Sequence, residues 1–387
     1  MWQRPWLHRK QQGAGRRPQA VREPHTPGLQ TDTTVRRGEG GSRWDWYQYK
    51  LVVSIILLAL AMGACTLRAT QQSSSASEAG TITVYTAFPP NEAALYLRDF
   101  QLVFPDIQIN LVQGPIDQLT NRLLTEQAAP QADVIWGVSL TNLLLLEWND
   151  LLKPYAPVGV ERLSPRFVDA RTPPYWVGAY LSMTAYCVNL DAAARRGVVP
   201  PRTWLDLIKP IYRRSLVMPN PNTSSVGLTA ILTIFELYNE RDAWLYLDEL
   251  HKNIATYTTD ESQTCRLVDS GDYPIGIARA ITGLNNSRII YPREGSGWEI
   301  TAAALVRKDP IQPAARTFLD WAMSKSVMPL YARQSPLTGM VTGIPSPSGF
   351  PVNPEAQLLR QDASWGAANR SRILREWRRR YSDKVTN

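Results

Sequence analysis

Short stretches of alternating and helical hydrophobic spacing follow one another from residue 81 to residue 148. Alternating apolar and polar positions, or a short apolar run, predict three strands, over 81–87, 106–112 and 132–137. Helical spacing between and after these strands predicts helices over 92–100, 118–127 and 140–148. A repeated strand–helix order is typical of a mostly parallel sheet with helices on both faces, so we expect an α/β fold.

Two longer extended segments, 175–189 and 297–307, enclose a second α/β unit of about 189–290. Its pattern predicts strands over 215–218 and 273–278 and helices over 204–208, 241–251 and 263–270. Beyond it we expect a helix over 313–324, proline-rich turns over 335–354 and a basic, solvent-facing helix over about 355–381. The length of 387 residues suits two lobes, for which we expect the boundaries 81–185 with 298–345 and 186–297 with 346–387.

The segment Pro219–Thr229, PNPNTSSVGLT, combines turn residues with a cluster of hydroxyls. Thr223, Ser224 and Ser225 stand just before an apolar helical pattern that begins at Leu228. Hydroxyl side chains are common where a helix begins, and a helix start carries unpaired N–H groups and a partial positive charge. The segment therefore predicts a binding site for a small oxyanion. An ordinary capped helix without a ligand is the alternative that the segment alone leaves open.

The first 80 residues have the features of an export and anchoring segment. Residues 1–50 form a basic leader that we expect to be disordered, and residues 51–65 contain a short apolar run typical of a signal peptide. The run ends at Met62-Gly63-Ala64-Cys65, which resembles the lipobox of bacterial lipoproteins and implies lipidation of Cys65. An uncleaved anchor helix is the alternative. The polar residues 66–80 then serve as a flexible linker.

Charge and histidine content argue against several classes of function. Residues 1–50 hold ten Lys/Arg and four Asp/Glu, so only +2 of the formal charge of +8 belongs to residues 51–387. A nucleic-acid surface is therefore not indicated. His251 is the single histidine beyond residue 50, which argues against a histidine-rich metal site or a histidine-based catalytic triad. No catalytic motif is present, so we expect neither enzymatic activity nor a cofactor.

Two α/β units joined by two extended crossings look like a type II solute-binding protein of an ABC importer. Seven runs occur in the order found in the branch with ferric-ion-binding and phosphonate- or sugar-phosphate-binding proteins: VYTAFPP, ADVIWG, WVGAYLSMTAYCVN, PNTSSVGLT, SGDYPIGIA, YPREGSGWEITAAALVRKD and AARTFLDWAMSK. The resemblance covers about 80–345. It implies a two-lobed fold with two hinge crossings, a monomer, a small anionic solute such as a phosphonate or phosphate ester, and a membrane permease as partner. It also implies an exported protein, either lipid-anchored at the outer face of the cell membrane or periplasmic.

The same resemblance implies a set of ligand contacts. In that branch the segment matching 222–227 holds an anion with hydroxyls and backbone N–H groups, which carries over to Thr223, Ser224, Ser225 and Val226. Ser225 stands where glycine is usual, and its Cβ would limit how closely a phosphate approaches the backbone.

Four further residues are candidates for the cleft between the lobes. We expect Phe88, Trp136 and Trp298 to wall it, with burial in a lobe core as the alternative for each. Arg279 could pair with an anion through two hydrogen bonds, with an ordinary surface charge as its alternative.

Ferric binding is the weaker hypothesis for the ligand. Ferric relatives use two adjacent tyrosines as phenolate ligands, but Ala280 and Ile281 stand at that position, and the acidic ligand expected near Gly137 is missing. An enzyme with Ser224 or Ser225 as nucleophile, or a sensor domain, would be a function of another class. A Cys187–Cys265 disulfide is possible if the protein is exported, but the sequence does not decide it.

We predict that Cys65→Ser releases the protein from the membrane fraction, because the thiol is the predicted site of lipid attachment. Fractionation and immunoblotting of cells that express the variant would measure this release. A variant that remains with the membrane would show that the apolar segment itself is the anchor.

Overall fold

The computed structural model describes residues 80–385 except 260, 282, 342 and 344, and these residues belong to one compact unit. The leader, the apolar run, Cys65 and the linker lie outside the described residues, so the predictions for them stay predictions. Within the described part, no helix combines the length and apolar character that a membrane span requires.

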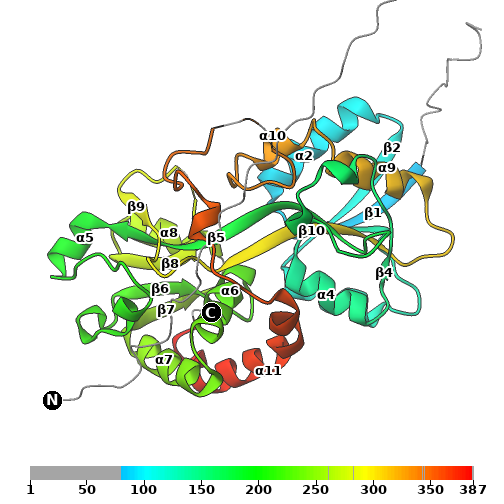
Figure 1. Ribbon diagram of the computed structural model, residues 1–387. Coiled ribbons are helices and arrows are strands. Elements are labelled where there is room, and N and C mark those ends of the chain that lie inside the picture. The colour runs from blue at the N-terminus through cyan, green and yellow to red at the C-terminus, as the bar shows by residue number, and fades with distance from the viewer. Residues whose placement is uncertain (1–79, 260, 282, 342, 344, 386–387) are drawn as a thin grey trace, which may run out of the picture. The chain divides into compact units, whose positions relative to one another are not determined.

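The first α/β unit has the predicted strand–helix order (Figure 1). Strand β1 (Gly80–Thr86) pairs in parallel with β2 (Ile107–Gln113) and with β3 (Val134–Ser139). The helices of this unit are α2 (Pro90–Val103), α3 (Ile116–Thr125), α4 (Leu140–Trp148) and, from later in the chain, α9 (Pro313–Ala322) and α10 (Met328–Tyr331). Each predicted strand and helix of this part is therefore confirmed within a few residues.

The two extended segments form long antiparallel strands, β5 (Val177–Asn189) and β10 (Trp298–Val306). β5 pairs with β10 from Val177 to Met183 and with β8 (Ile275–Arg279) from Thr184 to Val188. It thus belongs to both half-sheets, and Figure 1 shows β5 and β10 running between them. Short strands β4 (Leu152–Lys153) and β9 (Ser287–Ile290) pair with β10 and β5. This is the two-lobed type II arrangement that the sequence predicts.

The second half-sheet continues from β8 to β6 (Leu216–Pro219) and β7 (Ile254–Thr258), all three parallel. Its helices are α5 (Leu190–Arg195), α6 (Ser225–Leu237), α7 (Glu240–Asn253) and α8 (Glu261–Asp269). The sequence pattern missed α5, α10, β4, β7 and β9. Short 3-10 turns occupy Val160–Arg162, Pro165–Phe167, Leu205–Ile208, Pro210–Tyr212, Glu355–Gln357 and Ser382–Lys384.

Separate cores lie on the two half-sheets. Trp204, Tyr212 and Trp377 are central to the core of the second half. The first half has a core on each face of its sheet, one around Trp136 and Phe318 and one under the leucines of α4. The exact lobe boundaries stay our proposal.

The C-terminal helix α11 (Ala363–Tyr381) begins later than expected. Residues from 355 were predicted to be helical, but only the turn Glu355–Gln357 precedes it, and the Asp362 side chain accepts a hydrogen bond from the N–H of Trp365 as the N-cap. α11 buries Ile373 and Trp377 in the second-half core and Ala367 in a first-half core. The helix therefore contacts both halves and is more than a solvent-facing surface.

Cys187 on β5 and Cys265 on α8 form a disulfide, with their Cα atoms 5.7 Å apart and both side chains buried. We predict that replacing both cysteines with serine lowers the free energy of unfolding by about 2–4 kcal/mol, because the cross-link restricts the unfolded chain. Urea denaturation of the oxidised protein would measure the loss. A non-reducing peptide map that shows two free thiols would contradict the pairing.

Candidate functional site

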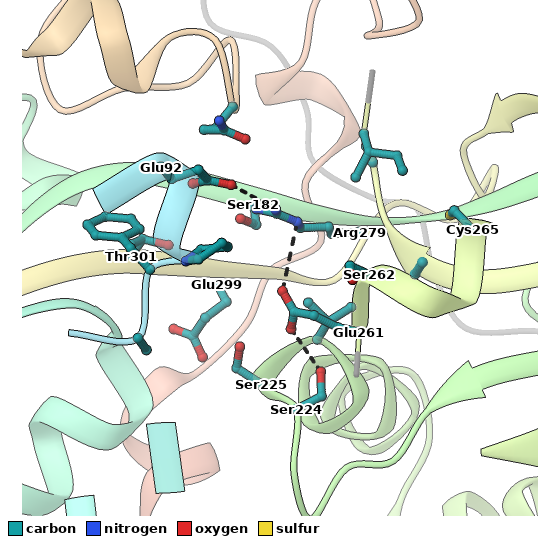
Figure 2. Close-up of a pocket in the computed structure, with 18 of the residues that line it drawn as sticks. Glu92, Ser182, Ser224, Ser225, Glu261, Ser262, Cys265, Arg279, Glu299 and Thr301 are labelled. Atoms are coloured by element: carbon teal, nitrogen blue, oxygen red, sulfur yellow. Dashed lines mark hydrogen bonds and ion pairs between the residues drawn. The ribbon is translucent and has the colours of Figure 1, made fainter. Parts of the chain in front are cut away.

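A cleft of about 1410 Å³ is lined by residues of both half-sheets (Figure 2). The first half contributes the turn from Ala87 to Glu92 and the end of β3. The second half contributes the start of α6, the start of α8 and the end of β8. Side chains of the crossing strands β5 and β10 line the cleft as well. A solute in this cleft would therefore contact elements of both halves.

The start of α6 has the capped geometry that its sequence predicts. Ser224 is the N-cap, and its Oγ accepts a hydrogen bond from the N–H of Gly227 at 3.3 Å. The N–H groups of Ser225 and Val226 are at the first two helical positions, where an α-helix supplies no acceptor. A Cβ on Gly227 would lie 2.5 Å from the carbonyl oxygen of Pro219, so glycine lets the helix begin directly against the turn.

Thr223, Ser224, Ser225 and Val226 all line the cleft, but their hydroxyls are not equivalent. The Thr223 hydroxyl donates to the carbonyl oxygen of Thr259 at 3.0 Å, and the Ser224 hydroxyl donates to Oε2 of Glu261 at 2.9 Å. The Ser225 side chain is half-buried at the cleft wall. Ser225 therefore offers the hydroxyl that a ligand reaches with the least rearrangement.

A chain of charged groups crosses the cleft from α8 to α2 (Figure 2). Nε of Arg279 lies 3.9 Å from Oε1 of Glu261, and its Nη2 lies 3.7 Å from Oε1 of Glu92. Glu92 belongs to the first half and Arg279 and Glu261 to the second, so the guanidinium joins carboxylates of both. The bidentate anion partner expected at Arg279 is thus, in this structure, a pair of protein carboxylates.

Burial strongly affects the pKa values of these cleft residues. Burial raises the pKa of Glu92, although Arg279 opposes the shift. Burial disfavours the charged form of Arg279, but Tyr180, Glu261 and Glu92 together raise its pKa. Burial also raises the pKa of Tyr180, which lines the cleft beside Arg279, to about 12. Arg279 therefore stays a cation and Tyr180 a neutral phenol at neutral pH.

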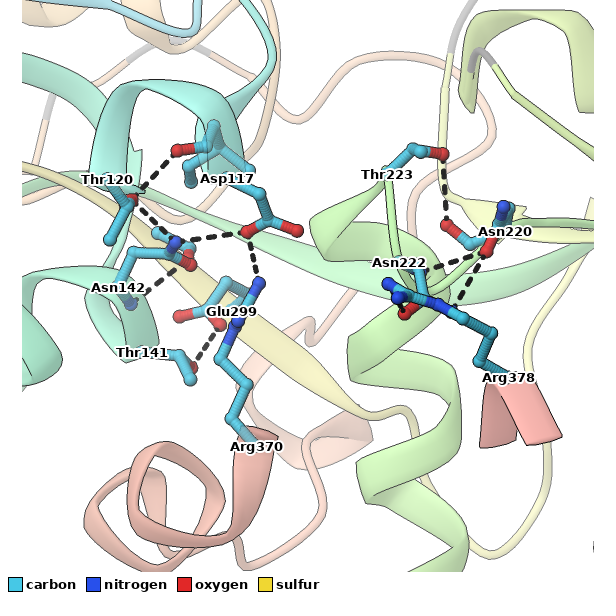
Figure 3. A network of polar contacts seen from close by, with 12 residues as sticks. Asp117, Thr120, Thr141, Asn142, Asn220, Asn222, Thr223, Glu299, Arg370 and Arg378 are labelled. Atoms are coloured by element: carbon cyan, nitrogen blue, oxygen red, sulfur yellow. Dashed lines mark hydrogen bonds and ion pairs between the residues drawn. The ribbon is translucent and has the colours of Figure 1, made fainter. Parts of the chain in front are cut away.

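Glu299 on β10 is a second acidic group of the cleft. Its carboxylate accepts hydrogen bonds from the Thr141 hydroxyl at 2.7 Å and from the N–H of Ile300 at 3.1 Å. Burial nevertheless raises its pKa to about 7. Beside it, Arg370 of α11 pairs with Asp117 of α3, which also accepts from Asn142 (Figure 3). At neutral pH Glu299 can both donate and accept a hydrogen bond.

Two of the three expected aromatic walls lie elsewhere. Phe88 lines the cleft and packs on Trp136, with ring centroids 4.7 Å apart. Trp136 is fully buried in the first-half core, where its Nε1 donates to the Tyr331 hydroxyl at 3.0 Å. Trp298 is not among the residues that line the cleft, and its Nε1 donates to the carbonyl oxygen of Leu359 at 2.7 Å. The expectation for Trp136 and Trp298 as cleft walls was therefore wrong.

Sequence reasoning missed the acidic residues of the cleft. Glu299 offered a signal, because it is the one charged residue in the otherwise uncharged strand Trp298–Val306. Glu92 and Glu261 offered none, because acids are common in the first turn of any helix. Among the described residues, no group of three His, Cys, Asp or Glu is arranged to hold a metal ion.

We predict that Glu299→Gln stabilises the protein more at pH 8 than at pH 5. The folded-state pKa of Glu299, about 7, lies above the unfolded value of about 4.5. The contribution of Glu299 to the free energy of unfolding is therefore fully present at low pH and is lost as pH rises through 7. The variant lacks this loss. The gain in the free energy of unfolding that the substitution causes should therefore be larger at pH 8 than at pH 5, by up to about 3 kcal/mol. Urea denaturation of both proteins at each pH would measure it, and an equal effect at both would contradict the assignment.

Comparisons with known proteins agree with this geometry. A family model described as "Bacterial extracellular solute-binding protein" matches residues 132–357. A Sinorhizobium fredii protein described as a probable ABC transporter periplasmic-binding protein is 25% identical over 304 residues, 75% of this chain and 82% of the relative.

Two solved structures share the fold. The periplasmic binding protein AfuA from Actinobacillus pleuropneumoniae, with fructose-6-phosphate bound, has a TM-score of 0.70 at 21% identity over 79% of this chain and 99% of its own. Iron-bound HitA from Pseudomonas aeruginosa has a TM-score of 0.66 at 20% identity over 76% of this chain and 98% of its own. At these identities they show a common fold and leave the ligand open. The family model, however, matches more than half of the chain, and this protein therefore belongs to the bacterial extracellular solute-binding proteins.

Proposed function

We propose that this protein captures a small phosphate ester or phosphonate in its cleft and delivers it to the membrane permease of an ABC importer. The observation that carries the proposal is the start of α6, which opens into the cleft with the Ser225 hydroxyl and the N–H groups of Ser225 and Val226. Such a helix start favours an oxyanion through its unpaired donors and its dipole. The relative described as an ABC transporter protein supports the permease as partner.

The rest of the cleft supports an ester that carries hydroxyl groups. Glu92 is nine-tenths buried, and its Oε2 has no hydrogen-bond partner among the described residues. Because an unsatisfied buried acceptor is costly, a donor on the ligand at this position would be stabilising. Glu299 also lines the cleft, and its carboxyl group could exchange a hydrogen bond with a ligand hydroxyl. AfuA, which was solved with a sugar phosphate, provides a precedent on this fold.

Closure of the two halves follows from the position of the contacts. The proposed anion contacts belong to the second half, whereas Glu92 and Phe88 belong to the first. A ligand that touches both halves favours the closed state by the free energy of the contacts that exist only there. The crossing strands β5 and β10 would act as the hinge. We also propose that the protein works as a monomer tethered through a lipid on Cys65.

The structure supports ferric binding less well. Phenolate ligands would require Tyr180 to ionise, but burial raises its pKa to about 12, even though the Arg279 cation beside it favours the ionised form. A cation beside the site also opposes a trivalent metal.

An enzyme with Ser224 as nucleophile is also poorly supported. The only histidine of the described residues, His251, contacts the Tyr257 hydroxyl at 3.1 Å and Asp383 at 3.2 Å, and it does not line the cleft. The Ser224 hydroxyl therefore has no histidine base within the cleft.

We predict that Ser225→Ala weakens binding of a phosphate ester about tenfold to a hundredfold, because it removes one charge-assisted hydrogen bond. Ser225→Asp should abolish binding, because its carboxylate repels the ligand anion. Calorimetric titration with phosphonates, sugar phosphates, phosphate, carboxylates and neutral sugars would test both.

The matched control is Ser371→Asp, which adds the same charge on the exposed face of α11, away from the cleft. This variant should bind like the wild type. A neutral sugar that binds best, and that Ser225→Asp still binds, would show that the start of α6 is only a capped helix.

A further inference from the structure

We propose that Glu261 is a built-in competitor for the solute's anionic group, and that it sets the affinity and selectivity of the cleft for anions. The inference rests on the proposed function and adds a residue that acts against binding. The solute's anion would replace the Glu261 carboxylate on the donors that the carboxylate occupies in this structure.

The Glu261 carboxylate is hydrogen-bonded to one group that suits a phosphate and ion-paired with another. Its Oε2 accepts from the Ser224 hydroxyl at 2.9 Å, and its Oε1 faces Nε of Arg279 at 3.9 Å. Ser224 in turn caps α6 through the N–H of Gly227. The carboxylate therefore lies between the helix start and the guanidinium, as Figure 2 shows. Hydroxyl and guanidinium donors beside a helix N-terminus are also what a phosphate requires.

The donors are fixed, whereas the carboxylate can move. Ser224 is only 4% exposed, and the side chain of Arg279 is held between Glu92 and the neighbouring Tyr180. The Glu261 side chain is 35% exposed at the first residue of α8. One turn further along, the Cys265 disulfide with Cys187 anchors this helix to β5. Rotation of the Glu261 side chain would thus free both donors without displacement of α8.

Charge balance favours replacement of the Glu261 carboxylate by the phosphate over binding of both beside Arg279. Arg279 already faces two carboxylates, Glu92 and Glu261, so a phosphate placed beside both would add a further negative charge near one cation. If the phosphate replaces Glu261, that side chain turns towards solvent and the repulsion is removed.

Exchange also makes the cleft selective among anions. A carboxylate ligand offers the same group that Glu261 supplies intramolecularly at high effective concentration, so it competes poorly. A phosphate carries a charge of about −1.5 to −2 and three acceptor oxygens, and it can prevail. The resident glutamate therefore discriminates against carboxylates in favour of phosphates and phosphonates.

The test is Glu261→Gln, with inorganic phosphate, methylphosphonate and acetate as probes in calorimetric titrations. The amide oxygen of glutamine can still accept from Ser224, so the helix start is kept while the charge is lost. We expect phosphate and methylphosphonate to bind about tenfold more tightly, and acetate binding to become detectable. Melting of the ligand-free variant should occur at a lower temperature, because the built-in anion is lost.

Two further variants separate this role from general effects. Glu261→Ala should shift anion affinity in the same direction, because it also removes the competitor. Glu249→Gln removes an exposed carboxylate of α7 that pairs with Lys252, and it should leave the affinity for each anion unchanged.

An affinity of Glu261→Gln for phosphate equal to or weaker than that of the wild type would overturn the inference, because Glu261 would then be a bystander or a ligand contact. The proposed function would stand in that case, since the wild type binds. If neither the wild type nor Glu261→Gln binds any phosphate or phosphonate, the proposed function fails as well.

Discussion

The antiparallel pairing of β5 with β10 is the interaction on which both halves depend. β5 pairs with β10 as far as Met183 and with β8 from Thr184 onward, so one strand belongs to both half-sheets. The same strands line the cleft through Tyr180, Ser182 and Glu299. Bending at the crossings would therefore move the groups that contact a solute, and a solute held there would resist bending. Because α11 also packs on both halves, closure must preserve its contacts or exchange them.

The parallel strands of each half place the ends of strands and the starts of the following helices at the cleft. β1, β3 and β6 are each followed closely by a helix, and the residues of these connections line the cleft. Ligands of open α/β sheets bind at the carboxyl ends of the strands, because the following helices point their N-termini there. The position of the cleft is therefore a consequence of strand direction in both half-sheets, whereas its chemistry depends on a few side chains at the helix starts.

The hydrophobic pattern predicted most elements because each one buries one face. It missed β7, which follows α7 without a turn, and β9, which has four residues and is only half-buried. The site was partly predictable, since a hydroxyl cluster before an apolar run marks a helix start such as that of α6. The sequence could not predict whether Trp136 faces the core or the cleft. Neighbouring residues of a strand face opposite sides of the sheet, and the register of β3 depends on its pairing with β1 and β10. The contact of Glu261 with Ser224 joins residues 37 apart, which local pattern cannot reveal.

Acidic residues in a cleft proposed for anions need a physical reason, and the helix starts supply one. Glu92 lies in the first turn of α2, and Glu261 is the first residue of α8, so each carboxylate is stabilised by the dipole of its own helix. Between them lies the Arg279 cation, which faces one carboxylate from each half. In the ligand-free cleft the charge of Arg279 is thus balanced by the protein's own carboxylates, and an arriving anion gains only the difference between its contacts and theirs. Affinity in such a cleft depends on how weakly the resident carboxylate is held as much as on how strongly the solute is bound.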